Sequence, residues 1–211
     1  MTKVKICGLS RAEDIEAVNR FLPDFIGFVF APSRRRVDTK TADILKNNLD
    51  PQIEVVGVFV NESLNTVAEV YKRETIDIVQ LHGDEDDDYI RRLKDRCGCT
   101  VIKALGVGDA LPPLPLEADY LLFDTLSDQR GGVGKVFNWS VLHDYHGPPY
   151  FLAGGLTAQN VANSIQLLNP FCVDVSSGVE TDGIKDAEKI EAFIDFRRLR
   201  NSDNHSLSQL R

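Results

Sequence analysis

The sequence predicts a small (β/α)8, or TIM, barrel of the α/β class, because three features coincide along its 211 residues. Eight short apolar segments have the character of buried strands, and segments of helical periodicity lie between most of them. These units follow one another at intervals of roughly 20 to 30 residues. An open, doubly wound sheet is the alternative for such an alternation, but eight units at this spacing favour the closed barrel.

The predicted strands are rich in valine, isoleucine and phenylalanine, and their hydrophobicity is nearly continuous. Parallel strands that are covered on both faces have this pattern, whereas strands with one exposed face alternate. The eight segments are residues 4–7, 25–30, 55–60, 76–81, 101–105, 120–123, 150–153 and 171–175.

Six further segments carry apolar residues at helical spacing: 11–20, 39–48, 63–73, 86–96, 157–168 and 186–198. Between the fifth and sixth strands the chain has Pro112, Pro113 and Pro115, which cannot lie in a continuous helix. We therefore expect a proline-rich loop or a single turn in place of the fifth helix. No linker divides the chain, so we expect one catalytic domain over residues 1–199 and a polar tail over 200–211.

Composition narrows the range of functions. A formal charge of −8 argues against nucleic-acid binding, although a local cluster of donors could still hold one small anion. No apolar run reaches the roughly 18 residues that a membrane span needs, and the first residues do not resemble a secretory signal. We therefore expect a cytoplasmic protein with no membrane segment.

The four cysteines are expected to be reduced thiols, because a chain of this size needs no disulfides. They are Cys7, Cys97, Cys99 and Cys172. The pair at 97 and 99 has no second Cys or His cluster at metal-ligand spacing, so no metal site is expected.

Two side chains with acid–base chemistry end predicted strands. In a (β/α)8 barrel the carboxyl ends of the strands and the loops after them form the active-site face. Cys7 ends the first strand, and Asp124 ends the sixth, where apolar surroundings could raise its pKa and keep it partly protonated. A thiol and a carboxyl at this face are a candidate base and acid. The alternatives are a buried core thiol and an aspartate that braces its loop.

Glycine turns follow the last two strands, as Gly154-Gly155 and Ser176-Ser177-Gly178. Barrels of this class most often hold a phosphate with these two loops, since glycine lets backbone N–H groups approach an anion. A short helix starting near Gly178 would point its positive end at the phosphate. Glycines that merely reverse the chain are the alternative.

Three further segments offer binding groups. A guanidinium from Arg34-Arg35-Arg36, after the second strand, could hold a carboxylate through two parallel hydrogen bonds, unless the run is a solvated loop. His82, after the fourth strand, could donate to a substrate, although a structural histidine is commoner. The segment 131–135, Gly-Gly-Val-Gly-Lys, lacks the spacing of a nucleotide P-loop, and Val136 stands where such a loop has Ser or Thr. We expect a flap over the mouth there.

Five short motifs in this order resemble the phosphoribosylanthranilate isomerase family. They are Lys5-Ile6-Cys7-Gly8, Gly27-Phe28-Val29-Phe30, Gly57-Val58-Phe59-Val60-Asn61, Gln80-Leu81-His82-Gly83 and Val173-Asp174-Val175-Ser176-Ser177-Gly178-Val179-Glu180. With the stretch from Gly131 to Trp139, they make the resemblance specific from about Val4 to Phe196. The family implies a (β/α)8 barrel and the isomerisation step of tryptophan biosynthesis. The chain departs from it at Asn138, where many relatives have Asp, and in the proline-rich loop.

The resemblance implies specific roles. The family's catalytic cysteine and aspartate fall on Cys7 and Asp124, and its arginine falls on Arg35, with Arg36 as the alternative register. The implied substrate is N-(5′-phosphoribosyl)anthranilate, which an Amadori rearrangement converts without a cofactor to 1-(2-carboxyphenylamino)-1-deoxyribulose 5-phosphate. The expected substrate-binding residues are Arg35, His82, Gly154, Gly155, Asp174, Ser177 and Gly178. We expect a monomer or a homodimer.

Two rival functions are compatible with the same scaffold. One is the related isomerase of the histidine pathway, which also performs an Amadori rearrangement but typically has an Asp where Cys7 stands. The other is a binding module that holds a phosphorylated aminosugar without converting it. Turnover of the two aminoaldoses separates all three.

Overall fold

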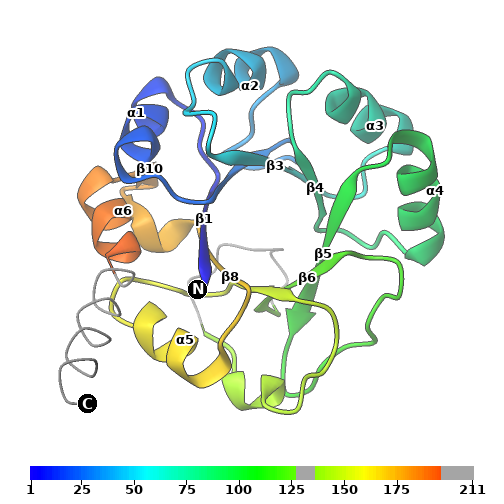
Figure 1. Cartoon of the computed structure of the whole chain (residues 1–211), viewed down its shortest axis with the longest axis vertical. Helices are drawn as coiled ribbons and strands as arrows, with labels where there is room; N and C mark the ends of the chain where they lie inside the picture. The colour runs from blue at the N-terminus through cyan, green and yellow to red at the C-terminus, as the bar shows by residue number, and fades with distance from the viewer. Residues whose placement is uncertain (127–135, 196–211) are drawn as a thin grey trace, which may run out of the picture.

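The computed structural model describes residues 1–126 and 136–195, in which eight parallel strands close into a barrel in sequence order (Figure 1). The strands are Lys3–Cys7 (β1), Phe25–Val29 (β2), Glu54–Phe59 (β3), Ile78–Leu81 (β4), Thr100–Val107 (β5), Tyr120–Thr125 (β6), Tyr150–Leu152 (β7) and Cys172–Val175 (β8). The predicted closed parallel barrel is confirmed, and the predicted strand ends differ from these by no more than two residues.

The barrel closes because β1 pairs with both β2 and β8. In this register Lys5 lies beside Asp174 of β8, and Cys7 lies beside Gly27 of β2. Since all eight strands are parallel, their carboxyl ends meet at one rim. Residues far apart in the sequence thereby reach the same mouth.

Six α-helices of the described residues surround the barrel (Figure 1). They are Ala12–Phe21 (α1), Thr39–Lys46 (α2), Leu64–Lys72 (α3), Asp87–Cys97 (α4), Val161–Leu168 (α5) and Ala187–Ile194 (α6). Four of them begin at a side chain that accepts a backbone N–H of the first turn, which stabilises the helix start; these residues are Asp38, Ser63, Asp86 and Asp186. Each predicted helix is present, but residues 196–198 of the last one, and the tail, lie outside the described residues.

Two connections contain no α-helix within the described residues. Residues 108–119, which include the three prolines, join β5 to β6 through bends and irregular backbone. Before β7 the chain forms one 3-10 turn, Trp139–Leu142 (η1), whose start is capped because Asn138 Oδ1 accepts from the N–H of Ser140 at 3.1 Å. Asparagine therefore serves at this position as a cap.

The segment after β8 was not predicted in detail. It consists of a 3-10 turn, Ser177–Val179 (η2), and a short antiparallel hairpin of Glu180–Thr181 (β9) and Ile184–Lys185 (β10). The helix expected near Gly178 is thus a single 3-10 turn, because the chain turns into β9 directly after it. This hairpin brings charged side chains back towards the mouth.

The inward face of the barrel changes character along its axis. Inward-facing residues in its lower part are apolar and form one core cluster, which includes Phe25, Val56, Ile102, Leu122 and Phe151. Two residues further along β6 and β8, the same face carries Asp124 and Asp174. A larger cluster packs the outward faces of the strands against the helices. The polar layer therefore rests on a closed apolar floor.

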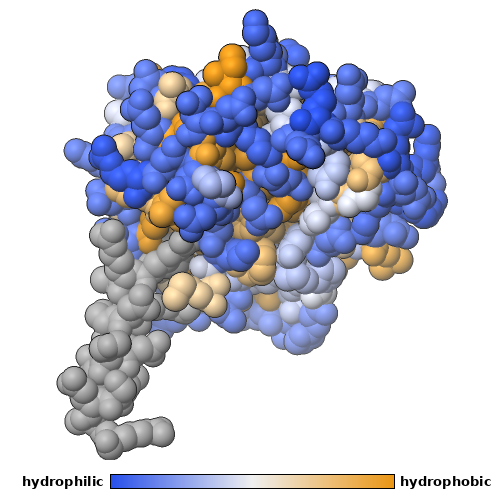
Figure 2. Space-filling view, turned by 45° about the horizontal axis from the view of Figure 1, so that its top comes forward, coloured by the Kyte–Doolittle hydropathy of each residue, from blue (hydrophilic) through white to orange (hydrophobic). Residues whose placement is uncertain are grey.

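The outer surface in Figure 2 is mostly hydrophilic, with apolar groups confined to patches between the hydrophilic ones. No helix in residues 1–126 and 136–195 is both long enough and apolar enough to cross a membrane.

Candidate active site

A cavity of about 640 Å³ opens at the carboxyl ends of the strands. All nine residues predicted for the site line it: Cys7, Arg35, His82, Asp124, Gly154, Gly155, Asp174, Ser177 and Gly178. Arg36, the alternative register for the arginine, is exposed and does not line the cavity. The segment 131–135, predicted as a flap, lies outside the described residues.

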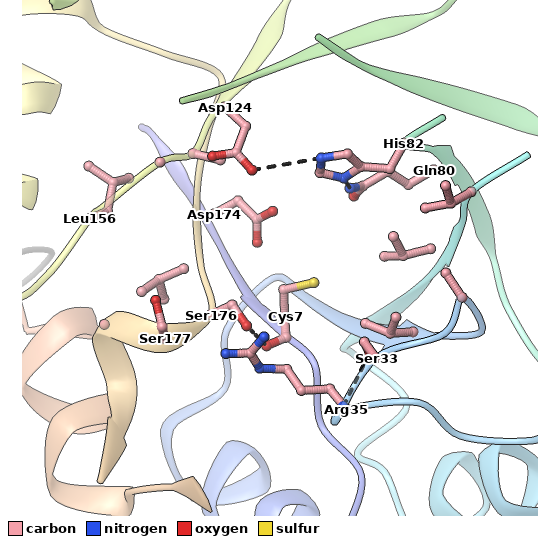
Figure 3. A pocket seen from close by; sticks show the side chains of 18 of the residues that line it. Cys7, Ser33, Arg35, Gln80, His82, Asp124, Leu156, Asp174, Ser176 and Ser177 are labelled. Atoms are coloured by element: carbon pink, nitrogen blue, oxygen red, sulfur yellow. Dashed lines mark hydrogen bonds and ion pairs between the residues drawn. The ribbon is translucent and has the colours of Figure 1, made fainter. Parts of the chain in front are cut away.

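The side chains of Cys7 and Asp124 reach this cavity from different strands. Figure 3 shows the sulfur of Cys7 and the carboxyl group of Asp124 pointing into it from opposite sides, with the carboxyl group of Asp174 between them in this view. Cys7 and Asp124 are each 9% exposed, so both titratable groups are buried at the bottom of the mouth. A molecule in the cavity can contact both.

Asp124 has the environment of a buried acid. Burial raises its pKa from 3.8 to about 6, and the nearby carboxylate of Asp174 adds to this, whereas a hydrogen bond from the N–H of Thr125 and the charge of Lys5 oppose it. The Thr125 N–H lies 2.8 Å from Oδ1. Near neutral pH a measurable fraction of the group is therefore protonated.

His82 lies between Asp124 and Gln80. Its Nε2 is 3.7 Å from Asp124 Oδ2, and its Nδ1 is 3.1 Å from the amide nitrogen of Gln80 (Figure 3). When that amide donates to Nδ1, the imidazole proton lies on Nε2 and faces Asp124. His82 can then donate to the carboxylate or to a ligand beside it.

The environment of Cys7 disfavours its thiolate. Burial raises the pKa of Cys7 above its ordinary value, and the carboxylate of Asp174 acts in the same direction. The ammonium of Lys5 opposes both, and that of Lys185 does so more weakly. Any use of this thiol as a base depends on the cations that lie around it.

Lys5 is such a cation, and sequence reasoning assigned it no role. Its side chain is fully buried, and Nζ donates to Asp174 Oδ2 at 2.9 Å and to Gln80 Oε1 at 2.8 Å. The strand period of two did carry a signal, because Lys5 and Cys7 of the same strand must share the inward face.

Arg35 is held in place by Glu180, a second residue that sequence reasoning left without a role. Nε donates to Oε1 at 2.6 Å and Nη2 donates to Oε2 at 2.9 Å. Gly8 makes room for this arginine: its φ is +83°, and a Cβ there would lie 2.4 Å from Arg35 Cδ. The guanidinium is thereby fixed at the cavity wall, with Nη1 outside these two bonds.

The turns after β7 and β8 form another part of the wall. Gly154 has a φ of +84°, and a Cβ there would lie 2.4 Å from Thr125 Oγ1, so only glycine fits. After β8, Ser176 Oγ donates to the carbonyl of Cys7 at 2.9 Å, and Lys185 Nζ donates to the carbonyl of Ser176 at 2.9 Å. These bonds fix the β8 turn to the end of β1.

Within residues 1–126 and 136–195, no group of three or more His, Cys, Asp or Glu side chains is arranged to hold a metal ion. The chemistry available at this site from the described residues is that of a thiol, carboxyl groups, an imidazole and a guanidinium.

A closed (β/α)8 barrel with ionisable side chains and glycine turns around one mouth has the architecture of a (β/α)8-barrel enzyme. The family model described as N-(5′phosphoribosyl)anthranilate (PRA) isomerase matches residues 4–196. The chain belongs to this family of isomerases of tryptophan biosynthesis.

Individual relatives support this assignment. The N-(5′-phosphoribosyl)anthranilate isomerase of Endomicrobium trichonymphae is 49% identical over 191 residues, which cover 90% of this chain and 95% of the relative. That of Clostridium acetobutylicum is 49% identical and covers 92% and 97%. Among solved structures, the phosphoribosylanthranilate isomerase of Thermotoga maritima has a TM-score of 0.82 at 36% identity, covering 94% of this chain and 99% of that one.

Proposed function

We propose that the chain converts N-(5′-phosphoribosyl)anthranilate to 1-(2-carboxyphenylamino)-1-deoxyribulose 5-phosphate by an Amadori rearrangement, with Asp124 as general acid and Cys7 as general base. The observation that carries this proposal is that the two side chains face one cavity from opposite sides. A substrate between them can gain a proton on one side and lose one on the other.

In the first step, Asp124 donates its proton to the furanose ring oxygen. The bond between this oxygen and C1′ breaks, and the nitrogen lone pair forms an iminium with C1′. Burial supports this role, since it raises the pKa of Asp124 to about 6 and keeps part of it protonated near neutral pH.

In the second step, the Cys7 thiolate removes the C2′ proton, which the iminium has made acidic. The C2′–H electrons form the C1′–C2′ double bond and neutralise the iminium. The resulting enolamine tautomerises to the ketose. Over these steps Asp124 loses a proton and Cys7 gains one, so a single negative charge passes from sulfur to carboxylate.

The remaining lining residues would position the substrate. The glycine turns at 154–155 and 177–178 line the cavity and would hold the phosphate, as loops after the last two strands of such barrels commonly do. Arg35 would bind the anthranilate carboxylate, and His82 would donate to a substrate oxygen. Asp174 Oδ1 is buried without a hydrogen-bond partner among the described residues, which suits the acceptor of a sugar hydroxyl.

The solved structure of a relative supports the proposed class of ligand. A phosphoribosylanthranilate isomerase with a TM-score of 0.78 and 33% identity to this chain has been determined in complex with reduced 1-(o-carboxyphenylamino)-1-deoxyribulose 5-phosphate. Another structure concerns monomers generated from the dimeric enzyme of Thermotoga maritima. For this chain we propose a monomer or a homodimer, which light scattering of the purified protein decides.

The test is turnover of phosphoribosylanthranilate by the purified full chain, followed by fluorescence, with the histidine-pathway aminoaldose as the comparison substrate. We expect Cys7→Ser and Asp124→Asn each to lower kcat by at least about 100-fold while binding of the reduced product analogue persists. Cys99→Ser and Asp109→Asn, at a buried thiol and an exposed carboxyl that do not line the cavity, are matched controls. Near-normal turnover in either cavity variant would refute its role.

A further inference from the structure

Lys5 carries a charge directly behind the cavity. It is fully buried, and its partners Asp174 and Gln80 line the cavity whereas Lys5 does not. Its Nζ lies 2.9 Å from Asp174 Oδ2 and 2.8 Å from Gln80 Oε1. A side chain in this position acts on a bound molecule through the groups in front of it.

A buried ammonium is unfavourable unless its surroundings compensate for it. Burial works to lower the pKa of Lys5, but the charge and the hydrogen bond of the Asp174 carboxylate, with the thiolate forms of Cys7 and Cys172, raise it above its ordinary value. Lys5 is therefore a permanent cation in the folded protein at neutral pH. Its ion pair with Asp174 is a fixed dipole within the polar layer.

The two ends of this ion pair act unequally on Cys7 and Asp124. Lys5 shares β1 and its inward face with Cys7, and its charge acts on the thiol more strongly than that of Asp174 does. At Asp124 the order is reversed, and the carboxylate of Asp174 acts more strongly than Lys5. In the view of Figure 3 the Asp174 carboxyl group lies between the side chains of Cys7 and Asp124.

The orientation of the Lys5–Asp174 ion pair matches the protonation states from which the proposed reaction starts, a Cys7 thiolate and a protonated Asp124. Burial alone places the proton on Cys7, which is the wrong protonation state for a base. The positive end of the ion pair favours a negative charge on Cys7, and its negative end favours a proton on Asp124.

We propose that the Lys5–Asp174 ion pair is a positioning element of the acid–base pair, whose ammonium end stabilises the Cys7 thiolate and whose carboxylate end keeps the proton on Asp124. The inference rests on the proposed roles of Cys7 and Asp124, and it adds the source of the charge that the thiol needs.

Other charged groups face the same thiol or the same ion pair. The surrounding elements contribute five titratable groups that interact electrostatically with Cys7 or Lys5. They are Cys172 and Asp174 of β8, Asp124 of β6, Lys185 of β10 and Arg35 after β2. Lys185 and Arg35 both bind Glu180, which also pairs with Arg34, so these three cations share one carboxylate. Lys5 is the cation that lies on the same strand as the thiol.

The test measures the pH dependence of alkylation of Cys7 by iodoacetamide in the folded full chain without substrate, with mass spectrometry of the Cys7 peptide. We expect Lys5→Met to raise the pKa of Cys7 by about one pH unit or more, and Asp174→Asn to lower it. Shifts of opposite sign identify an oriented ion pair, because loss of packing alone gives no such pair of shifts. Alkylation of Cys97 on α4 provides an internal control.

Two further measurements keep the outcome decisive. Should Lys5→Met fail to fold because Asp174 is left buried and unpaired, Asp174→Asn and the double variant Lys5→Met/Asp174→Asn, which removes both charges, take its place. We expect the double variant to lie between the single variants where all fold. In turnover, Lys5→Met should lower kcat more than it raises KM, and its pH profile should shift with the thiol.

An unchanged Cys7 alkylation profile in the variants that fold, or shifts of Lys5→Met and Asp174→Asn in the same direction, would overturn the inference. The outcome is separable from that of the proposed function, because alkylation reports on the thiol without turnover. An active Cys7→Ser variant removes the role of the base but leaves the alkylation result standing.

Discussion

Arg35 and Glu180 form a two-point ion pair at the rim of the barrel, with nitrogen–oxygen distances of 2.6 and 2.9 Å. The pair joins the loop after β2 to the hairpin after β8, which are 145 residues apart in the sequence. Lys185 donates to the same carboxylate at 2.6 Å. Glu180 therefore organises the cationic wall of the cavity.

Glu180→Gln tests this organisation. Burial acts to raise the pKa of Glu180, but Arg35 and Lys185 together hold it below its ordinary value, so the group is a carboxylate at neutral pH. The amide cannot accept from both cations equally, and Arg35 should lose its fixed orientation. We expect KM to rise by about 10-fold or more with a smaller change in kcat. Steady-state kinetics with Glu191→Gln, on the exposed side of α6, as control checks this; an unchanged KM contradicts it.

Gly8→Ala should displace the side chain of Arg35. A methyl group at Gly8 meets Arg35 Cδ at 2.4 Å and also strains a backbone with φ of +83°. We expect a loss of about 1 kcal/mol or more in unfolding free energy together with a raised KM. Gly98→Ala is the matched control, because its φ is +65° but nothing lies within 4 Å of the added carbon. It should lose stability and keep its KM, and equal KM values in the two variants would contradict the contact.

Asp124→Asn should stabilise the fold while it removes activity. A carboxyl whose pKa rises from 3.8 to about 6 on folding holds its proton in the folded state after the unfolded chain has released it. Stability is therefore lost as pH rises from about 4 to 6, and the full penalty persists above that range. We expect the amide variant to gain about 2 to 3 kcal/mol at pH 7.5 and little at pH 4. Urea unfolding at both pH values checks the sign, and equal stability at pH 7.5 would contradict the raised pKa.

Lys103→Met probes the support of the loop that carries His82. Lys103 Nζ lies 2.7 Å from the carbonyl oxygen of Gly83 and 3.1 Å from Glu85 Oε2, and the two ionic side chains are 6% and 2% exposed. Removing one partner leaves Glu85 buried, so we expect a loss of about 3 kcal/mol in unfolding free energy. Arg91→Met, which breaks an exposed pair with Asp88, should cost less than about 1 kcal/mol. Chemical unfolding compares the two, and similar losses would contradict the buried pair.

Local patterns were sufficient for the closed barrel and for the position of the cavity at its mouth. Continuous apolar segments marked the strands, and the position of Cys7 and Asp124 at strand ends placed them at one mouth. The proline run predicted an interrupted connection, but the hairpin after β8 was not predicted, since two-residue strands leave no periodicity to detect.

The sequence by itself determined the barrel, the family and nine of the residues that line the mouth, because these follow from patterns along the chain. Only the tertiary structure decided which charges meet there. Lys5 pairs with Asp174, which is 169 residues away in the sequence, and Arg35 pairs with Glu180, which is 145 residues away. The effect of a charge depends on its distance in space and on burial, and a linear sequence specifies neither until the barrel has closed.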